Sequence, residues 1–164
     1  MYLRMLRNAN SLLRKYKIEE FPIKMDMLEY IISDAGIKIE IARHLRESLY
    51  YEVNTSKIIY LGPALEMAKK RECLIHELAH TYHCGNTAHL APLAVSKNEE
   101  QAKAFAAYFL MPVGVFEAAC KDGENRYSLS NIFGVKQDFV MYRQQLGLAL
   151  LHSGLYNKFR YKHK

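Results

Sequence analysis

Two of the three histidines in the segment RECLIHELAHTYHCG, which runs from Arg71 to Gly85, stand four residues apart, and a glutamate directly follows the first of them. His76 and His80 are four residues apart, so on an α-helix their side chains point to the same side, one turn from each other. Two imidazoles placed in this way can hold one metal ion. Glu77 is rotated by about 100° from His76, where it can take a proton from a water without being a ligand. The spacing predicts a metal site with a general base beside it.

A third ligand decides whether this pattern is a metal site, because an HExxH pattern would arise by chance in roughly 2 of 100 chains of this composition. Catalytic zinc is held by three protein ligands and one exchangeable water. Glu99 lies 19 positions after the second histidine and shares a helical face with the small residues Ala102 and Ala106, which would let two helices approach closely. Glu100 instead shares a face with Lys97, with which it could form a surface ion pair. We therefore expect Glu99 to be the third ligand.

Other candidate ligands lie on the same predicted helix. His83 returns to the side of His76 after seven residues, and Cys84 follows it. A structural zinc site of His76, His80 and either Cys84 or His83 is an alternative, and its closed shell of four ligands would exclude catalysis. Such sites normally gather ligands from two short knuckles, which favours the catalytic interpretation. Cys73 and Cys84 are expected to be core or half-buried thiols. The histidines without ligand spacing are expected at the surface: His44, His89 and His163.

The segment HELAH, followed by E-x-x-A-x-x-F-A-A-x-x-L-M-P from Glu99 onward, resembles the ImmA/IrrE family of metallopeptidases over about residues 71–112. The predicted order of elements before it is also similar to that family. The resemblance implies a gluzincin-type site, with zinc on His76, His80 and Glu99 and with Glu77 as the general base. Lys103 departs from the pattern, because such sites usually have Asn or Asp there. Those residues can accept a hydrogen bond from a ligand imidazole, whereas lysine cannot.

Apolar periodicity predicts the elements that must position these residues. IKIEI, LYYEV and KIIYL alternate as half-buried strands, the last two joined by a tight turn of Asn54, Thr55 and Ser56. The result is a small antiparallel sheet of about three strands. Helices are expected over about 3–16, 24–35, 64–84 and 97–110, with a loop over 85–96 and two or three short helices in the last third.

The chain of 164 residues, half of them hydrophobic, is long enough for one core and short for two. We expect one α+β domain of zincin-like architecture over 1–155. Its parts are N-terminal helices and sheet (1–62), metal-site helices (63–112) and C-terminal helices (113–155), followed by a basic aromatic tail (156–164).

The charge and the cysteine content indicate which partners and which cellular compartment suit the protein. A net charge of +6 and a pI near 9.2 permit contact with nucleic acid or acidic partners without establishing it. Three cysteines without regular spacing argue against a disulfide framework and for a reducing compartment, so we expect a cytoplasmic location. The N-terminus lacks the apolar centre of a secretory signal, and no segment approaches the ~18 apolar residues of a membrane span.

A DNA-binding outline is present but weak. Residues 128–148 predict a helix, a turn at Gly134 and Val135, and a second helix, which resembles a helix-turn-helix. The second helix does not cluster its basic residues, so packing or substrate positioning is the favoured role. Its polar residues are Lys136, Gln137, Arg143, Gln144 and Gln145.

These observations favour a zinc-dependent endopeptidase that acts on a protein substrate. Tyr108, Tyr127 and His152 are candidate donors to the oxyanion, although no spacing supports them. The resemblance implies that the substrate is a DNA-binding repressor of a mobile element or stress regulon, such as a helix-turn-helix repressor encoded nearby. The alternative is a non-catalytic regulator that keeps a metal-stabilised fold and binds DNA or a partner.

Overall fold

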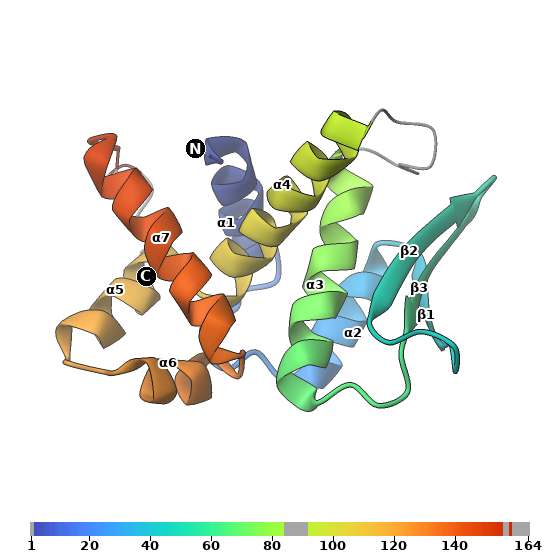
Figure 1. The fold of residues 1–164 in the computed structure, drawn as a ribbon, viewed down its shortest axis with the longest axis horizontal. Coiled ribbons are helices and arrows are strands. Elements are labelled where there is room, and N and C mark those ends of the chain that lie inside the picture. Colours follow the sequence, from blue (N-terminus) through green and yellow to red (C-terminus); the bar gives the residue numbers. More distant parts are fainter. Residues whose placement is uncertain (1, 84–91, 156–157, 159–164) are drawn as a thin grey trace. The chain divides into compact units, whose positions relative to one another are not determined.

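The computed structural model describes residues 2–83, 92–155 and 158 (Figure 1). The elements are α1 (Leu3–Lys15), α2 (Met25–Asp34), β1 (Ile37–Ile41), β2 (Ser48–Val53), β3 (Ser56–Leu61), α3 (Met67–His83), α4 (Pro92–Leu110), α5 (Val113–Lys121), α6 (Arg126–Phe133) and α7 (Gln137–His152). This confirms the α+β class. The chain divides into two compact units. One unit is Lys24–Lys103, and the other combines Met1–Ile23 with Ala104–Lys164, so one boundary falls inside α4. The single domain expected over 1–155 stays a prediction.

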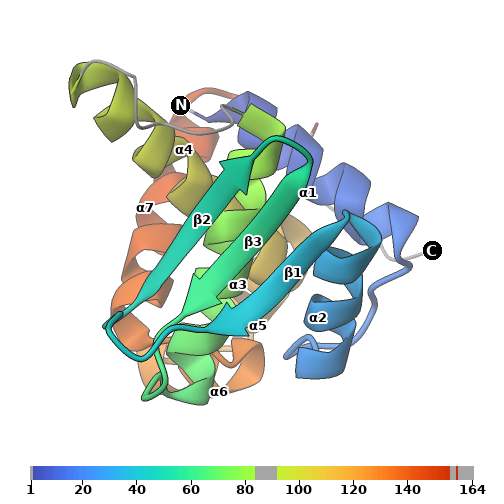
Figure 2. The ribbon, with the colours of Figure 1, turned by 90° about the vertical axis from the view of Figure 1, so that its right-hand side faces the viewer.

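The unit Lys24–Lys103 is built on the three-stranded sheet, whose strand order is β1-β3-β2. Ile59 of β3 lies opposite Ile39 of β1 in parallel pairing and opposite Tyr50 of β2 in antiparallel pairing. Helices α2 and α3 pack on one face of the sheet (Figure 2). Successive side chains of a strand point to opposite faces of the sheet. The buried side chains of Ile59 and Leu61 both point to the face that these helices cover. This order makes β2 an edge strand that lies against α3.

The parallel pairing of β1 corrects the expectation of an antiparallel sheet, which holds for β2 and β3. The chain passes from β1 to the far edge of the sheet before the hairpin returns it to the middle, so β1 and β3 run in the same direction. The hairpin turn is also shorter than expected. Asn54 adopts the left-handed region, with φ of 55°, and Ser56 already belongs to β3.

Two of the predicted helices begin elsewhere than expected. Helix α3 begins at Met67 and not near Ala64, and the loop expected over 85–96 is wrong in its second part because α4 begins at Pro92. Proline suits the first turn of a helix, since the N–H that it lacks would have no partner there. Residues 84–91 lie outside the described part of the chain. The short helices expected in the last third are confirmed as α5, α6 and α7.

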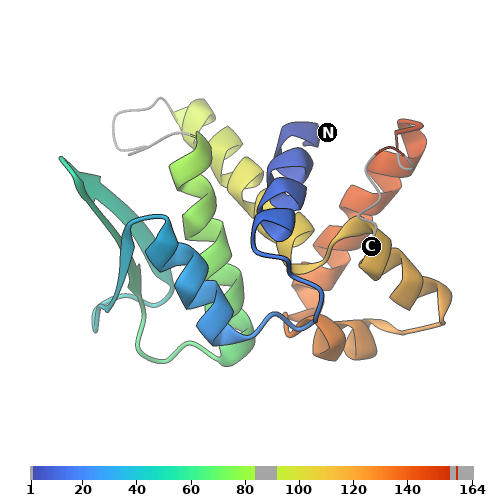
Figure 3. The ribbon, with the colours of Figure 1, turned by 180° about the vertical axis from the view of Figure 1, so that it is seen from behind.

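The other unit packs its helices around aromatic side chains. Phe105 and Phe109 of α4 stack with ring centroids 6.1 Å apart, and Phe116 of α5 lies 5.7 Å from Phe133 of α6. Helix α6 ends at Phe133 and is capped by Gly134, which has the left-handed φ of 60°, and α7 packs beside α6 (Figure 3). The helix, turn and helix predicted for this segment are confirmed. Among the described residues, no single helix is long and apolar enough to cross a membrane, and the bent pair of α4 and α5 meets that test only jointly.

Arg143 of α7 is a core residue, with only 2% of its surface exposed. Its Nε donates to the Met111 carbonyl at 2.8 Å, and its guanidinium lies over the rings of Tyr108 and Phe116 at 5.0 and 4.8 Å. A buried guanidinium cannot reach DNA, so Arg143 does not belong among the polar residues that α7 could present to a partner. Arg143 therefore has the packing role that was favoured for this segment.

We predict that Arg143→Ala lowers the free energy of unfolding by about 3 kcal/mol, because it removes a charged hydrogen bond and two ring contacts. Arg143→Lys should recover only part of this loss, since an ammonium lacks the planar fork of the guanidinium. Urea denaturation measures both. The exposed neighbour Gln145 provides the control, and Gln145→Ala should stay within about 0.5 kcal/mol of the wild type. Equal stability of the two alanine variants would contradict the core role.

Candidate metal centre

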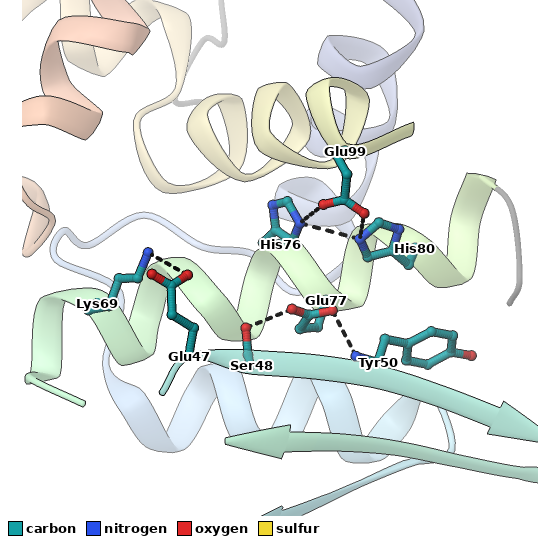
Figure 4. A network of polar contacts seen from close by, with 8 residues as sticks. All are labelled: Glu47, Ser48, Tyr50, Lys69, His76, Glu77, His80 and Glu99. Carbon is teal, nitrogen blue, oxygen red and sulfur yellow. Dashed lines mark hydrogen bonds and ion pairs between the residues drawn. The ribbon is translucent and has the colours of Figure 1, made fainter. Parts of the chain in front are cut away.

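Helix α3 carries the HExxH segment with one side turned into the core of its unit. Leu74, Ile75 and Leu78 are fully buried, and this fixes the rotation of the helix about its axis. His76 and His80 then point together toward α4, with ring centroids 5.0 Å apart (Figure 4). His80 is buried, whereas His76 is half-buried. The two imidazoles share one direction, as their spacing predicts.

Glu99 of α4 reaches this pair from the other side (Figure 4). Its Oε2 lies 3.0 Å from His76 Nε2, and its Oε1 lies 3.4 Å from His80 Nε2. The two Nε2 atoms are 3.3 Å apart. Among the described residues, these three side chains form the group of donors that could hold a metal ion. The structure thus brings together all three residues that were predicted as ligands.

The separations fit a tetrahedral zinc ion. Bonds of 2.0–2.1 Å at tetrahedral angles place two ligand atoms about 3.3–3.4 Å apart. The distance between the two histidine nitrogens matches that value, and the distances from His76 and His80 to Glu99 lie within 0.4 Å of it. Two imidazoles and one carboxylate are also the donor set of a catalytic zinc site, in which one position remains for an exchangeable water.

The surroundings favour the protonation states that metal ligation needs. Burial lowers the pKa of His80, and the neighbouring His76 lowers it further, against the opposing influence of Glu77 and Glu99. The hydrogen bond from His76 lowers the pKa of Glu99, although partial burial acts in the opposite direction. A neutral imidazole and an ionised carboxylate both have a lone pair to offer to a cation.

Glu77 turns away from this group toward the sheet, and β2 occupies both of its carboxyl oxygens (Figure 4). The Ser48 hydroxyl donates to Oε1 at 2.6 Å, and the Tyr50 backbone N–H donates to Oε2 at 2.9 Å. The Glu77 side chain is buried. Neither donor was predicted: Ser48 lay one residue before the predicted strand, and Tyr50 lay within it but contributes through its backbone N–H. The only available signal was the two-residue spacing that places positions 48 and 50 on one face of a strand.

The structure also shows the burial of most other residues that the sequence singled out near the candidate site. Glu100 and Lys97 are exposed, in agreement with their expected place at the surface, and Lys103 is half-buried. Cys73 is buried as predicted, and this burial raises the pKa of its thiol. His44 is exposed, also as predicted. The alternative ligands of the closed zinc site lie outside the described side chains, as do two of the expected surface histidines; they are His83, Cys84, His89 and His163.

The three candidate donors to the oxyanion belong to the other unit. Tyr108 is buried in its core beneath Arg143, and burial raises the pKa of its phenol. Tyr127 of α6 and His152 in the last turn of α7 are exposed. The catalytic role of each stays a prediction.

Comparison with known proteins supports the implied family. The model of the Peptidase_M78 family, described as the IrrE N-terminal-like domain, matches residues 32–145 and so includes the sheet, α3 and α4. Among solved structures, a Mycobacterium tuberculosis transcriptional regulator matches with a TM-score of 0.69 and 18% identity, over 85% of this chain and 46% of that one.

At that identity the match shows the fold alone, and the chain spans about half the length of the solved protein. The search of curated proteins found no match. The family model covers most of the chain, including HExxH and the helix that carries Glu99. The chain therefore belongs to the Peptidase_M78 family, the IrrE N-terminal-like domain.

Proposed function

We propose that the protein is a zinc-dependent endopeptidase. The observation that carries this proposal is the convergence of His76, His80 and Glu99, with donor separations of 3.0–3.4 Å, beside the buried carboxyl group of Glu77. Three ligands leave a position for water, and a carboxyl group next to the ligands can serve as the base that this water needs. Membership of a peptidase family supports the same reaction.

In this mechanism, His76, His80 and Glu99 would hold a zinc ion. A zinc ion held there would polarise the scissile carbonyl and acidify the attacking water. Glu77 takes a proton from that water and passes it to the leaving amine as the peptide C–N bond breaks, without a covalent intermediate. The edge strand β2, which lies against α3, offers backbone groups with which an extended substrate can pair.

The proposed substrate is a protein. The family resemblance points to a DNA-binding repressor of a mobile element or stress regulon, with a helix-turn-helix repressor encoded nearby as the first candidate. A cytoplasmic location fits such a substrate and the odd number of cysteines.

A second candidate function is a regulator that keeps the metal site without cleaving anything. The solved structure of similar fold is named a transcriptional regulator, and the net charge of +6 suits contact with DNA. Lys103 also stands where the family pattern has a residue able to accept a hydrogen bond from a ligand imidazole. Salt-sensitive DNA binding without cleavage of the repressor would favour this function.

We predict that the purified protein binds close to one zinc ion. His76→Ala and Glu99→Ala should each abolish stoichiometric binding, because each removes one of three ligands. Metal analysis after dialysis against a weak chelator measures the content. Glu100→Ala is the matched control, since it removes an exposed carboxylate from the next position of the same helix and should keep the zinc. Retention of zinc by Glu99→Ala would exclude the three-ligand site.

We predict that Glu77→Gln keeps the zinc but lowers cleavage at least a hundredfold, because the amide retains the shape of the side chain and cannot act as a base. The measurement is cleavage of the helix-turn-helix repressor encoded nearby, with dye-labelled casein as a general substrate. Metal content and the melting temperature are compared in the same preparations. Undiminished cleavage by this variant would remove Glu77 from the mechanism.

A further inference from the structure

The contact between Glu77 and β2 engages both oxygens of the carboxyl group. Ser48 and Tyr50 stand two residues apart, so their side chains lie on the face of the strand that is turned toward α3. Ser48 contributes its hydroxyl, at 2.6 Å, and Tyr50 contributes its backbone N–H, at 2.9 Å. A carboxyl group held by two donors on a strand has a fixed position and a fixed plane.

A second polar link joins the same two parts of the fold without touching the site. Lys69 of α3 pairs with Glu47, directly before β2, at 3.2 Å (Figure 4). The Glu47 side chain is 66% exposed, so this pair contributes little to stability. Comparison of these two contacts distinguishes a general link between α3 and β2 from a contact that acts on Glu77.

We propose that Ser48 is a positioning residue for the general base, which holds the Glu77 carboxyl group in one position and one plane beside the helix that carries His76 and His80. This inference rests on the proposed peptidase function. Because β2 is the edge strand on which a substrate can pair, the strand that receives the substrate also aligns the base.

Ser48→Val and Ser48→Thr form the test, because the two side chains have nearly the same shape and only threonine keeps the hydroxyl. With dye-labelled casein, Ser48→Val should lower kcat about tenfold while KM and zinc content stay unchanged, and Ser48→Thr should restore kcat. Glu47→Gln, which breaks the neighbouring link, should leave kcat unchanged. An unchanged kcat in Ser48→Val would overturn the proposal, as would an equal loss in Glu47→Gln.

A readout without turnover separates this proposal from the peptidase function. Acetohydroxamate binds zinc and shares its proton with a neighbouring carboxylate, so its affinity reports on the position of Glu77. Calorimetry on the zinc-loaded protein should show affinity about tenfold weaker for Ser48→Val and for Glu77→Gln, and unchanged for Ser48→Thr and Glu47→Gln.

If the wild type cleaves no peptide but shows this pattern, the positioning role stands and the peptidase function fails. If the wild type cleaves casein and neither kcat nor affinity responds to the loss of the hydroxyl, only the positioning role fails. A wild type that takes up no zinc would overturn both.

Discussion

A carboxyl group buried between a helix and a sheet must have hydrogen-bond donors, and this constraint at Glu77 organises the site. Burial of a polar group without a partner costs roughly 1–3 kcal/mol in proteins. In this chain the donors are the Ser48 hydroxyl and the Tyr50 N–H, both on the edge strand. An edge strand has N–H groups that no neighbouring strand uses, so β2 can supply one without losing a bond within the sheet. The order β1-β3-β2 is therefore part of the site, because it leaves β2 at the edge beside α3.

The candidate metal ligands depend on a different requirement, which is the approach of two helices. His76 and His80 come from one helix, and local geometry alone brings their rings together. Glu99 comes from a segment 19 residues further on, and its approach depends on packing. The resulting separations of 3.0–3.4 Å lie within 0.4 Å of those expected around a tetrahedral ion.

The division between local and long-range geometry also explains what the sequence could predict. The helical spacing of HExxH and the small residues after Glu99 are local patterns, and they identified the three donors that the structure brings together. The parallel pairing of β1 depends on the path of the chain between strands, and hydrophobic alternation contains no information about that path. Ser48 escaped notice because a serine before a strand has many possible roles, and only the fold places it against Glu77. Arginine is usually exposed, so the sequence does not indicate that Arg143 is buried. Its burial depends on the aromatic rings that the fold places around it.

The way in which Glu77 is held bears on the choice between a catalytic and a purely structural ion. A structural zinc site has a closed shell of four protein ligands and needs no base. A buried carboxyl group beside such a site would need hydrogen-bond donors but would have no role at the metal. The exposed pair of Lys69 and Glu47 joins the same two parts of the fold but contributes little to stability, so it does not replace the contact of Glu77 with β2. Two donors on one carboxyl group fix its plane as well as its position, and a fixed plane matters to a group that must receive a proton from a defined direction. In the proposed mechanism, these two hydrogen bonds hold the Glu77 carboxyl group in the plane in which it exchanges a proton.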